Sequence, residues 1–256
     1  MTIARVVAAE ALDTLAPHDP AAIRSRRDLR RIHRAMGTQA IVTTALRHLL
    51  GARPEGAPLR VLELGAGDGQ LMLGVGRSLA HSAAPSPRVE LTLLDRQRLV
   101  SPATIAGYAA LGWHVVEAIA DVADVAEWAG AANRPQATEP HWDLIVANLF
   151  MHHFEGAPLA SLLAAIARRC DRFFACEPQR AWLALAGSHL VGAIGANAVT
   201  RQDAVLSVHA GFRDTELSAL WPGRAADWTL REYSAGLFSH CFHAERRAAP
   251  PVARSP

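Results

Sequence analysis

A short apolar segment that runs directly into three closely spaced glycines is the feature that most constrains this chain. The segment reads Val61-Leu-Glu-Leu-Gly-Ala-Gly-Asp-Gly69, and a helical pattern follows over 70–81. Glycine permits the tight backbone geometry of such a turn and lets a ligand approach the main chain closely. In open parallel sheets, ligands bind where the carboxyl ends of the strands meet the following helices. The segment therefore predicts a strand, a turn and a helix that form a ligand site.

Strand-like and helix-like segments alternate along the rest of the chain. This rhythm predicts an α/β fold with a doubly wound, mostly parallel seven-stranded sheet of the Rossmann-like type. Two strand-like segments close together near the C-terminus suggest that the last strand is antiparallel. The strands are expected over 59–64, 88–94, 113–118, 142–149, 172–176, 228–233 and 237–244.

The composition gives no support to a nucleic-acid-binding protein or to a disulfide-rich secreted protein. The formal net charge of the 256 residues is only +2, with arginine as the basic residue at all 26 Lys+Arg positions, so no strong electrostatic argument for nucleic acid exists. The three cysteines, Cys170, Cys176 and Cys241, have no Cys-x-x-Cys spacing and do not suggest a disulfide framework. No signal peptide is recognisable, so a cytoplasmic protein is expected.

One segment, 181–199, has no charged side chain and approaches the length of a membrane span. It is rich in alanine and glycine, contains His189 and Asn197, and is flanked by Arg180 and Arg201. A buried or pocket-lining helix is therefore expected instead of stable membrane insertion.

The glycine turn discriminates between classes of cofactor. A dinucleotide fingerprint needs a further glycine three residues after Gly67, where this chain has Gln70. A phosphate-binding P-loop needs Gly-Lys-Ser/Thr, which does not follow here.

Acidic residues follow the next two predicted strands. Asp95, at the end of the second strand, is placed to accept hydrogen bonds from both hydroxyl groups of a ribose. Asp121, after the third, could accept a hydrogen bond from an adenine amino group, and Asp124 is a rival for that role.

These motifs, together with Trp142-Asp-Leu-Ile-Val-Ala-Asn148, resemble those of class I S-adenosylmethionine-dependent methyltransferases of the small-molecule type. The resemblance covers about 59–178 well and the last two strands loosely. It implies S-adenosyl-L-methionine as the cofactor. It also implies a set of cofactor-binding residues: Glu63, Gly65, Ala66 and Gly67 at the methionine part, Asp95 and Arg96 at the ribose, Asp121 and Val122 at the adenine, and Asn148 and Leu149 near the sulfonium.

The acceptor side is expected just beyond the fourth and fifth strands. Methyl transfer to an alcohol or phenol requires alignment and removal of a proton, a task that suits histidine. His152, His153 and Glu177 are the candidate catalytic residues, with loop structure or packing as the alternative. No metal site is expected, because adjacent histidines do not share a helix face. Metal-dependent catechol methyltransferases carry Asp-Asn where this chain has Glu177-Pro178.

Five parts of the chain are expected. They are a helical N-terminal lid over 1–50, the cofactor-binding core over 51–178, a helical insertion over 179–223 that caps the acceptor, the last strands over 224–245, and a disordered tail over 246–256. The basic stretch 24–34 is either a solvated face or part of the lid, with Arg34 and Gly37 as the positions to follow.

The apolar insertion, if it lines a pocket, favours a hydrophobic or aromatic acceptor of the natural-product, polyketide or quinol kind, and hence O-methylation in secondary metabolism. The alternatives are N- or C-methylation, a nucleic-acid methyltransferase, a nicotinamide enzyme and a non-catalytic cofactor-binding module. The Asn-Pro-Pro-aromatic motif of base-modifying enzymes is replaced by Asn148-Leu-Phe-Met. The partners expected are a small-molecule acceptor and, in a homodimer, a second copy of the chain, with no nucleic acid.

Overall fold

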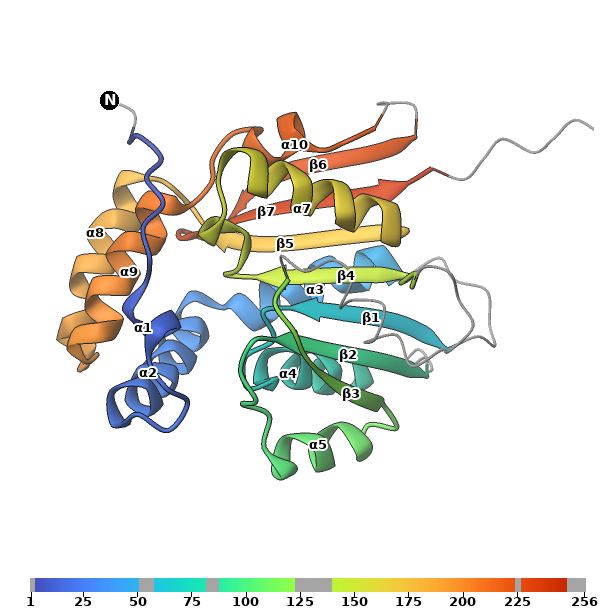
Figure 1. Cartoon of the computed structure of the whole chain (residues 1–256), viewed down its shortest axis with the longest axis horizontal. Coiled ribbons are helices and arrows are strands. Elements are labelled where there is room, and N and C mark those ends of the chain that lie inside the picture. Colours follow the sequence, from blue (N-terminus) through green and yellow to red (C-terminus); the bar gives the residue numbers. More distant parts are fainter. Residues whose placement is uncertain (1–2, 51–57, 82–87, 123–139, 224–226, 248–256) are drawn as a thin grey trace, which may run out of the picture.

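The computed structural model describes residues 3–50, 58–81, 88–122, 140–223 and 227–247. Its core is a seven-stranded sheet in the order β3-β2-β1-β4-β5-β7-β6 (Figure 1). The first five strands are parallel, and β7 runs antiparallel to both of its neighbours. The strands are β1 (Leu59–Leu64), β2 (Val89–Asp95), β3 (His114–Ile119), β4 (Leu144–Asn148), β5 (Arg172–Pro178), β6 (Trp228–Ala235) and β7 (Ser239–Arg246). The predicted α/β fold is confirmed.

Helices cover both faces of this sheet and bury the central strands. One core cluster joins the sheet to α3 (Thr38–Leu50), α4 (Gln70–Ala80) and α5 (Pro102–Ala109). The other joins it to α7 (Gly156–Arg169) and α10 (Glu216–Leu220). Because apolar side chains are needed on both faces, β1 and β4 are apolar almost throughout. β1 also carries Arg60 and Glu63, and Glu63 is buried with two acidic side chains as its charged neighbours, which marks it as a residue of interest.

The helical N-terminal region divides into two structural roles. Val42, Ala45, Leu46 and Leu49 of α3 are buried in the second core cluster, so α3 belongs to the helical layer of the core. The other two helices, α1 (Ala11–Thr14) and α2 (Pro20–Met36), lie beyond the carboxyl ends of the strands (Figure 1). Asp19 caps α2, and Gly37 at φ 70° ends it.

The region after β5 forms α8 (Trp182–Leu190), the short 3-10 helix η2 (Val191–Ile194), α9 (Ala198–Ala210) and α10. The apolar stretch 181–199 is thus divided among three helices. No helix in the described ranges is long and apolar enough to cross a membrane. Asn197 caps α9 by accepting a hydrogen bond from the Thr200 amide.

An extended segment that precedes α1 crosses the same end of the sheet. Val6 N donates to the His209 carbonyl at 3.1 Å, and the Arg5 guanidinium donates to the carbonyls of Phe154 and Ala210. Arg180 holds the start of the segment through the Ile3 carbonyl. These contacts place Glu10 beside the loop that follows β4.

A buried histidine in β7 predicts how stability depends on pH. Burial, followed by the charges of Arg231 and His48, lowers the pKa of His243 to about 4, and its ring is bonded to the Tyr233 hydroxyl. The folded protein therefore binds its proton less readily than the unfolded chain. The stabilisation is fully present above the unfolded pKa of about 6.5 and is lost as the pH falls toward 4.

Between pH 7 and pH 5, we expect His243 to reduce the free energy of unfolding by roughly 2 kcal/mol. Urea denaturation at both pH values, with His243→Gln compared to the wild type, measures this contribution. His114→Gln, at an exposed position of β3, is the matched control. An equal pH dependence in His243→Gln and wild type would contradict the assignment.

Candidate functional site

The glycine turn after β1 has the geometry that its sequence predicts. Gly65, Gly67 and Gly69 have φ angles of 66°, 56° and 70°, in the left-handed region. A Cβ atom on Gly65 would lie 2.4 Å from the Phe150 ring, whereas one on Gly67 would meet nothing within 4 Å. The turn is therefore packed against the loop after β4 at Gly65 and open at Gly67.

Asp95, at the end of β2, links the glycine turn to the turn that follows β2. Its two carboxylate oxygens accept hydrogen bonds from the amides of Gly67 and Gln97, both at 2.9 Å. The same carboxylate faces the opening beside the glycine turn, where it keeps further lone pairs for a ligand.

A pocket of about 880 Å³ lies between the carboxyl ends of β1, β2 and β4 and the helices α2 and α3. Its volume is within the range of roughly 300–1,000 Å³ that is typical of small-molecule sites. Eight residues of the predicted cofactor set line it: Glu63, Gly65, Ala66, Gly67, Asp95, Arg96, Asn148 and Leu149.

The other two residues of that set lie after β3. Asp121 is exposed and Val122 is buried, and neither lines the pocket. Asp124, the rival for the adenine contact, lies outside the described residues.

Three buried polar atoms of the pocket wall have no hydrogen-bond partner within the described part of the chain. They are Glu63 Oε2, Asn148 Oδ1 and His33 Nε2. Burial, reinforced by the charges of Asp68 and Asp95, raises the pKa of Glu63 well above its usual value. Buried oxygen atoms such as those of Glu63 and Asn148 are costly without a partner, so they point to a ligand that carries hydrogen-bond donors.

Leu149, immediately after β4, is strained. Its φ of 50° is unusual for a residue other than glycine, and its amide donates to the Cys176 carbonyl at 2.9 Å. Strained backbone of this kind concentrates at functional sites because the surrounding structure must maintain it. Here it turns the chain into the 3-10 helix η1 (Met151–His153), which carries both histidines.

Glu177, at the end of β5, organises η1. Its carboxylate is fully buried and accepts hydrogen bonds from the amides of Phe150, Met151 and His152. It also binds His152 Nδ1 at 2.8 Å. The structure thus brings together all three candidate catalytic residues, with Glu177 behind His152.

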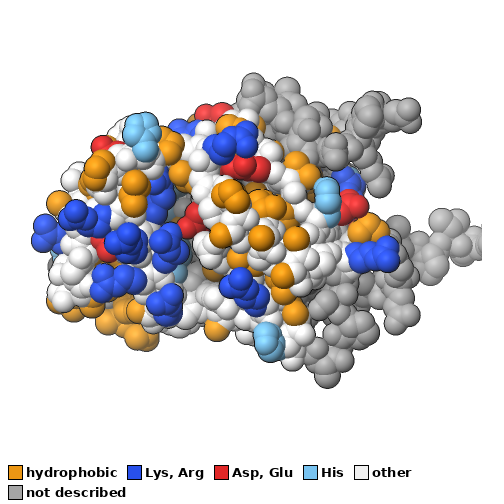
Figure 2. Space-filling model, turned by 90° about the horizontal axis from the view of Figure 1, so that it is seen from below, with side chains coloured by type: hydrophobic (Ala, Val, Ile, Leu, Met, Phe, Trp, Pro, Cys, Tyr) orange, Lys and Arg blue, Asp and Glu red, His pale blue; other side chains and the backbone are white. Residues whose placement is uncertain are grey.

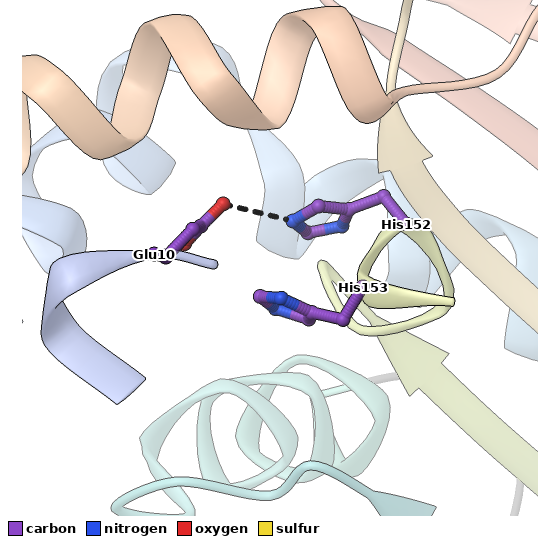
Figure 3. A group of neighbouring side chains, drawn as sticks. All are labelled: Glu10, His152 and His153. Carbon is purple, nitrogen blue, oxygen red and sulfur yellow. Dashed lines mark hydrogen bonds and ion pairs between the residues drawn. The ribbon is translucent and has the colours of Figure 1, made fainter. Parts of the chain in front are cut away.

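A fourth residue of this cluster, Glu10, was missed by sequence reasoning. Its carboxylate lies 3.3 Å from His152 Nε2 and is hydrogen-bonded to Ser207 of α9. Figure 3 shows the side chains of Glu10, His152 and His153 pointing toward one another. No local motif marks Glu10, because its partners are more than 140 positions away in the sequence.

The two histidines differ in charge because their environments differ. Burial opposes protonation of His152, but its bonds to Glu10 and Glu177 outweigh that effect and raise its pKa to about 9. Burial and the charge of His152 lower the pKa of His153. His153 is the more accessible, with 23% of its side chain exposed against 2% for His152.

The basic helix α2 forms the outer wall of the pocket. Figure 2 shows arginine side chains gathered on the left of the molecule, where this helix lies. Arg30 pairs with Asp68 at 2.7 Å, and both Arg34 and Gly37 line the pocket. None of the described residues of 179–223 does so. The apolar insertion therefore does not line this pocket, which was the condition for inferring a hydrophobic acceptor.

Comparison with known proteins adds evidence about the fold. No family model and no curated protein matches the sequence. Among solved structures, the plantazolicin methyltransferase BpumL in complex with SAH has a TM-score of 0.59 at 13% identity, over 90% of this chain and 92% of that one. An O-methyltransferase family protein from Burkholderia thailandensis has a TM-score of 0.56 at 15% identity, over 91% of this chain but 62% of that one. The CurJ carbon methyltransferase has a TM-score of 0.50 at 14% identity, over 82% and 54%.

The chain has the class I methyltransferase fold. The strand order, the antiparallel β7 and the match over nearly the full length of BpumL together establish this. These structural neighbours include both an O-methyltransferase family protein and a carbon methyltransferase. Proteins of this fold therefore transfer methyl groups to more than one kind of atom.

Two alanine substitutions in the glycine turn should differ in how much they lower the thermal stability of the protein. Gly67→Ala places a methyl group in the open pocket at a cost of about 1–2 kcal/mol for the left-handed backbone. Gly65→Ala adds a clash with Phe150 and should destabilise the protein considerably more. We therefore expect a larger loss of melting temperature for Gly65→Ala, measured by thermal denaturation without ligand. Equal losses would show that Phe150 yields without cost.

Proposed function

We propose that this protein is an S-adenosylmethionine-dependent methyltransferase that acts on a small-molecule acceptor. The observation that carries the proposal is the pocket at the glycine turn, which combines buried unpartnered acceptors with the Asp95 carboxylate. Such a combination suits a ligand with an ammonium group, a ribose and a positively charged sulfur.

The residues of the pocket fit the parts of this cofactor. Glu63 and Asn148 offer oxygen acceptors to its amino group, and Arg34 offers a cation to its carboxylate. Asp95 would hold the ribose, while Asp121 and Val122 remain the proposed neighbours of the adenine. When bound, the cofactor supplies a methyl group that its sulfonium already activates.

On the acceptor side, we propose His153 as the residue that meets the acceptor. It is the least buried member of the cluster, and its Nδ1 lies 3.4 Å from Asp13, which lines the pocket. For an alcohol or phenol it would accept the proton, and His152 and Glu177 would position it from behind. O-methylation is thus the narrower proposal, and N- or C-methylation is the alternative.

The polarity of the acceptor is a separate question. No described residue of the insertion lines the pocket, and its wall includes arginines of α2, so the proposal of an apolar acceptor has no support from the insertion. A screen should therefore pair phenolic and polyketide acceptors with acidic ones of similar size. A non-catalytic binding module would bind the cofactor but transfer no labelled methyl group to any acceptor.

Titration of the purified protein with S-adenosylhomocysteine, with NADH in parallel, tests the cofactor. We expect binding of the former alone, and Asp95→Ala should weaken it at least about tenfold, because hydrogen bonds to a charged group are lost. Asp227→Ala, at an exposed position before β6, is the matched control. Binding of NADH, or unchanged affinity in Asp95→Ala, would refute the cofactor assignment.

His153→Ala tests the acceptor side. Turnover of an acceptor found in the screen should fall about 100-fold or more, as expected for loss of a proton-transfer group. Affinity for S-adenosylhomocysteine should stay within about twofold of the wild type, because His153 does not line the cofactor pocket. Unchanged turnover would remove His153 from the proposal.

A further inference from the structure

We propose that Glu10, His152 and His153 form a binding site for a divalent transition-metal ion at the acceptor side of the pocket. Each residue offers one ligand atom, and these atoms lie within 4.8 Å of one another. The existence of the site is independent of the proposed methyl transfer, and only its role in the reaction rests on that function.

The separation of the first two ligand atoms suits a shared ion. Two atoms that each bind zinc at about 2.1 Å lie roughly 3.4 Å apart when the coordination is tetrahedral. His152 Nε2 and Glu10 Oε1 are 3.3 Å apart, longer than most charged hydrogen bonds. The ring centroids of His152 and His153 are 4.2 Å apart with the ring planes tilted by 33°, so the third ligand atom comes from the ring packed beside His152.

Glu177 provides the support that metal-binding histidines usually have. Ligand histidines almost always bond their second ring nitrogen to a carboxylate or carbonyl, which orients the ring and raises its basicity. Glu177 binds His152 Nδ1 at 2.8 Å and leaves Nε2 directed at Glu10. Because three backbone amides also hold Glu177, this orientation is rigid.

The site has one side toward the pocket. Asp13, three residues after Glu10, lies 3.4 Å from His153 Nδ1 and also lines the pocket. Asp13 is thus a candidate fourth ligand or an acceptor that steadies His153. A three-ligand site of two histidines and a glutamate, with a further position open, is the arrangement of several catalytic zinc centres.

The donor set also indicates which ions would bind. Imidazole nitrogens suit zinc, iron, cobalt and nickel, whereas magnesium and calcium prefer oxygen ligands throughout. Three carboxylates, those of Glu10, Asp13 and Glu177, surround the two histidines and favour a doubly charged ion electrostatically. In the reaction, such an ion would polarise an acceptor oxygen placed at the open position and so lower the pKa of its hydroxyl. With the ion bound, this effect would replace the proton-accepting role proposed for metal-free His153, because the ligating nitrogen would be occupied.

Titration with ZnCl2 and CoCl2 tests the site in full-length protein purified without a histidine tag. We expect one equivalent of either ion to bind saturably, and MgCl2 at the same concentrations not to compete. Bound Co²⁺ should show visible absorption typical of nitrogen and oxygen ligands, which Zn²⁺ removes. Absence of saturable binding, or a thiolate band that places the ion at a cysteine, would overturn the proposal.

Variants then locate the ion. Glu10→Gln and His153→Gln should each weaken Zn²⁺ binding by at least about tenfold, the lower limit seen for residues that support metal sites. His141→Gln, at a half-buried histidine that pairs with Asp171, should leave the Zn²⁺ affinity unchanged. Equal Zn²⁺ affinity in Glu10→Gln and wild type would overturn the proposal.

The outcome is separable from that of the proposed function. Titration with S-adenosylhomocysteine reports the cofactor pocket in every variant and confirms that each is folded. Metal binding without cofactor binding would refute the methyltransferase and keep the metal site. If the protein binds no Zn²⁺ but still binds the cofactor and turns over after treatment with a chelator, the metal site alone is refuted.

Discussion

The candidate site depends on the hydrogen bonds that the buried carboxylate of Glu177 accepts. It accepts hydrogen bonds from three successive amides of the loop after β4 and from the His152 ring. These bonds hold η1 in place and sustain the strained backbone at Leu149. They also position Phe150, whose ring packs against Gly65 so closely that a side chain at that position would have to displace it. One carboxylate thus connects the acceptor side of the site to the glycine turn of the cofactor side.

Charge is distributed unevenly across the pocket. Its inner wall carries the carboxylates of Asp68, in the glycine turn, and Asp95, at the end of β2, and its outer wall is the arginine-rich helix α2. Arg30 bridges the two walls through Asp68 and so fixes α2 over the turn. A ligand that presents positive charge inward and negative charge outward matches this gradient, as a zwitterionic amino-acid moiety does.

The N-terminal segment and the loop after β4 form the other half of the site. Arg5 binds the carbonyls of Phe154 and Ala210, and Arg180 holds the Ile3 carbonyl while pairing with Glu216. The segment is therefore tied both to η1 and to the helices after β5. These ties deliver Glu10 and Asp13 to the two histidines, so the N-terminal region supplies the site with residues as well as covering it.

The sequence by itself determined the sheet, the glycine turn and the strand-end side of the pocket. Buried parallel strands leave an apolar run in the sequence, and a turn that requires positive φ angles leaves glycines, so both signals are local. Residues at strand ends, such as Glu63, Asp95 and Asn148, were identifiable because parallel strands bring their ends to one edge. By the same reasoning His152, His153 and Glu177 could be placed at one edge of the sheet, but the sequence did not indicate which of them would meet the acceptor.

Only the tertiary structure decided how those three residues relate and what joins them. Glu10 meets His152 across 142 positions of sequence and carries no motif, so its part depends on how the N-terminal segment crosses the strand ends. The assignment of α3 to the core and the exclusion of the apolar insertion from the pocket have the same origin. An amphipathic or apolar helix shows in its sequence that it must be covered on one side, but which surface covers it is settled only by long-range packing.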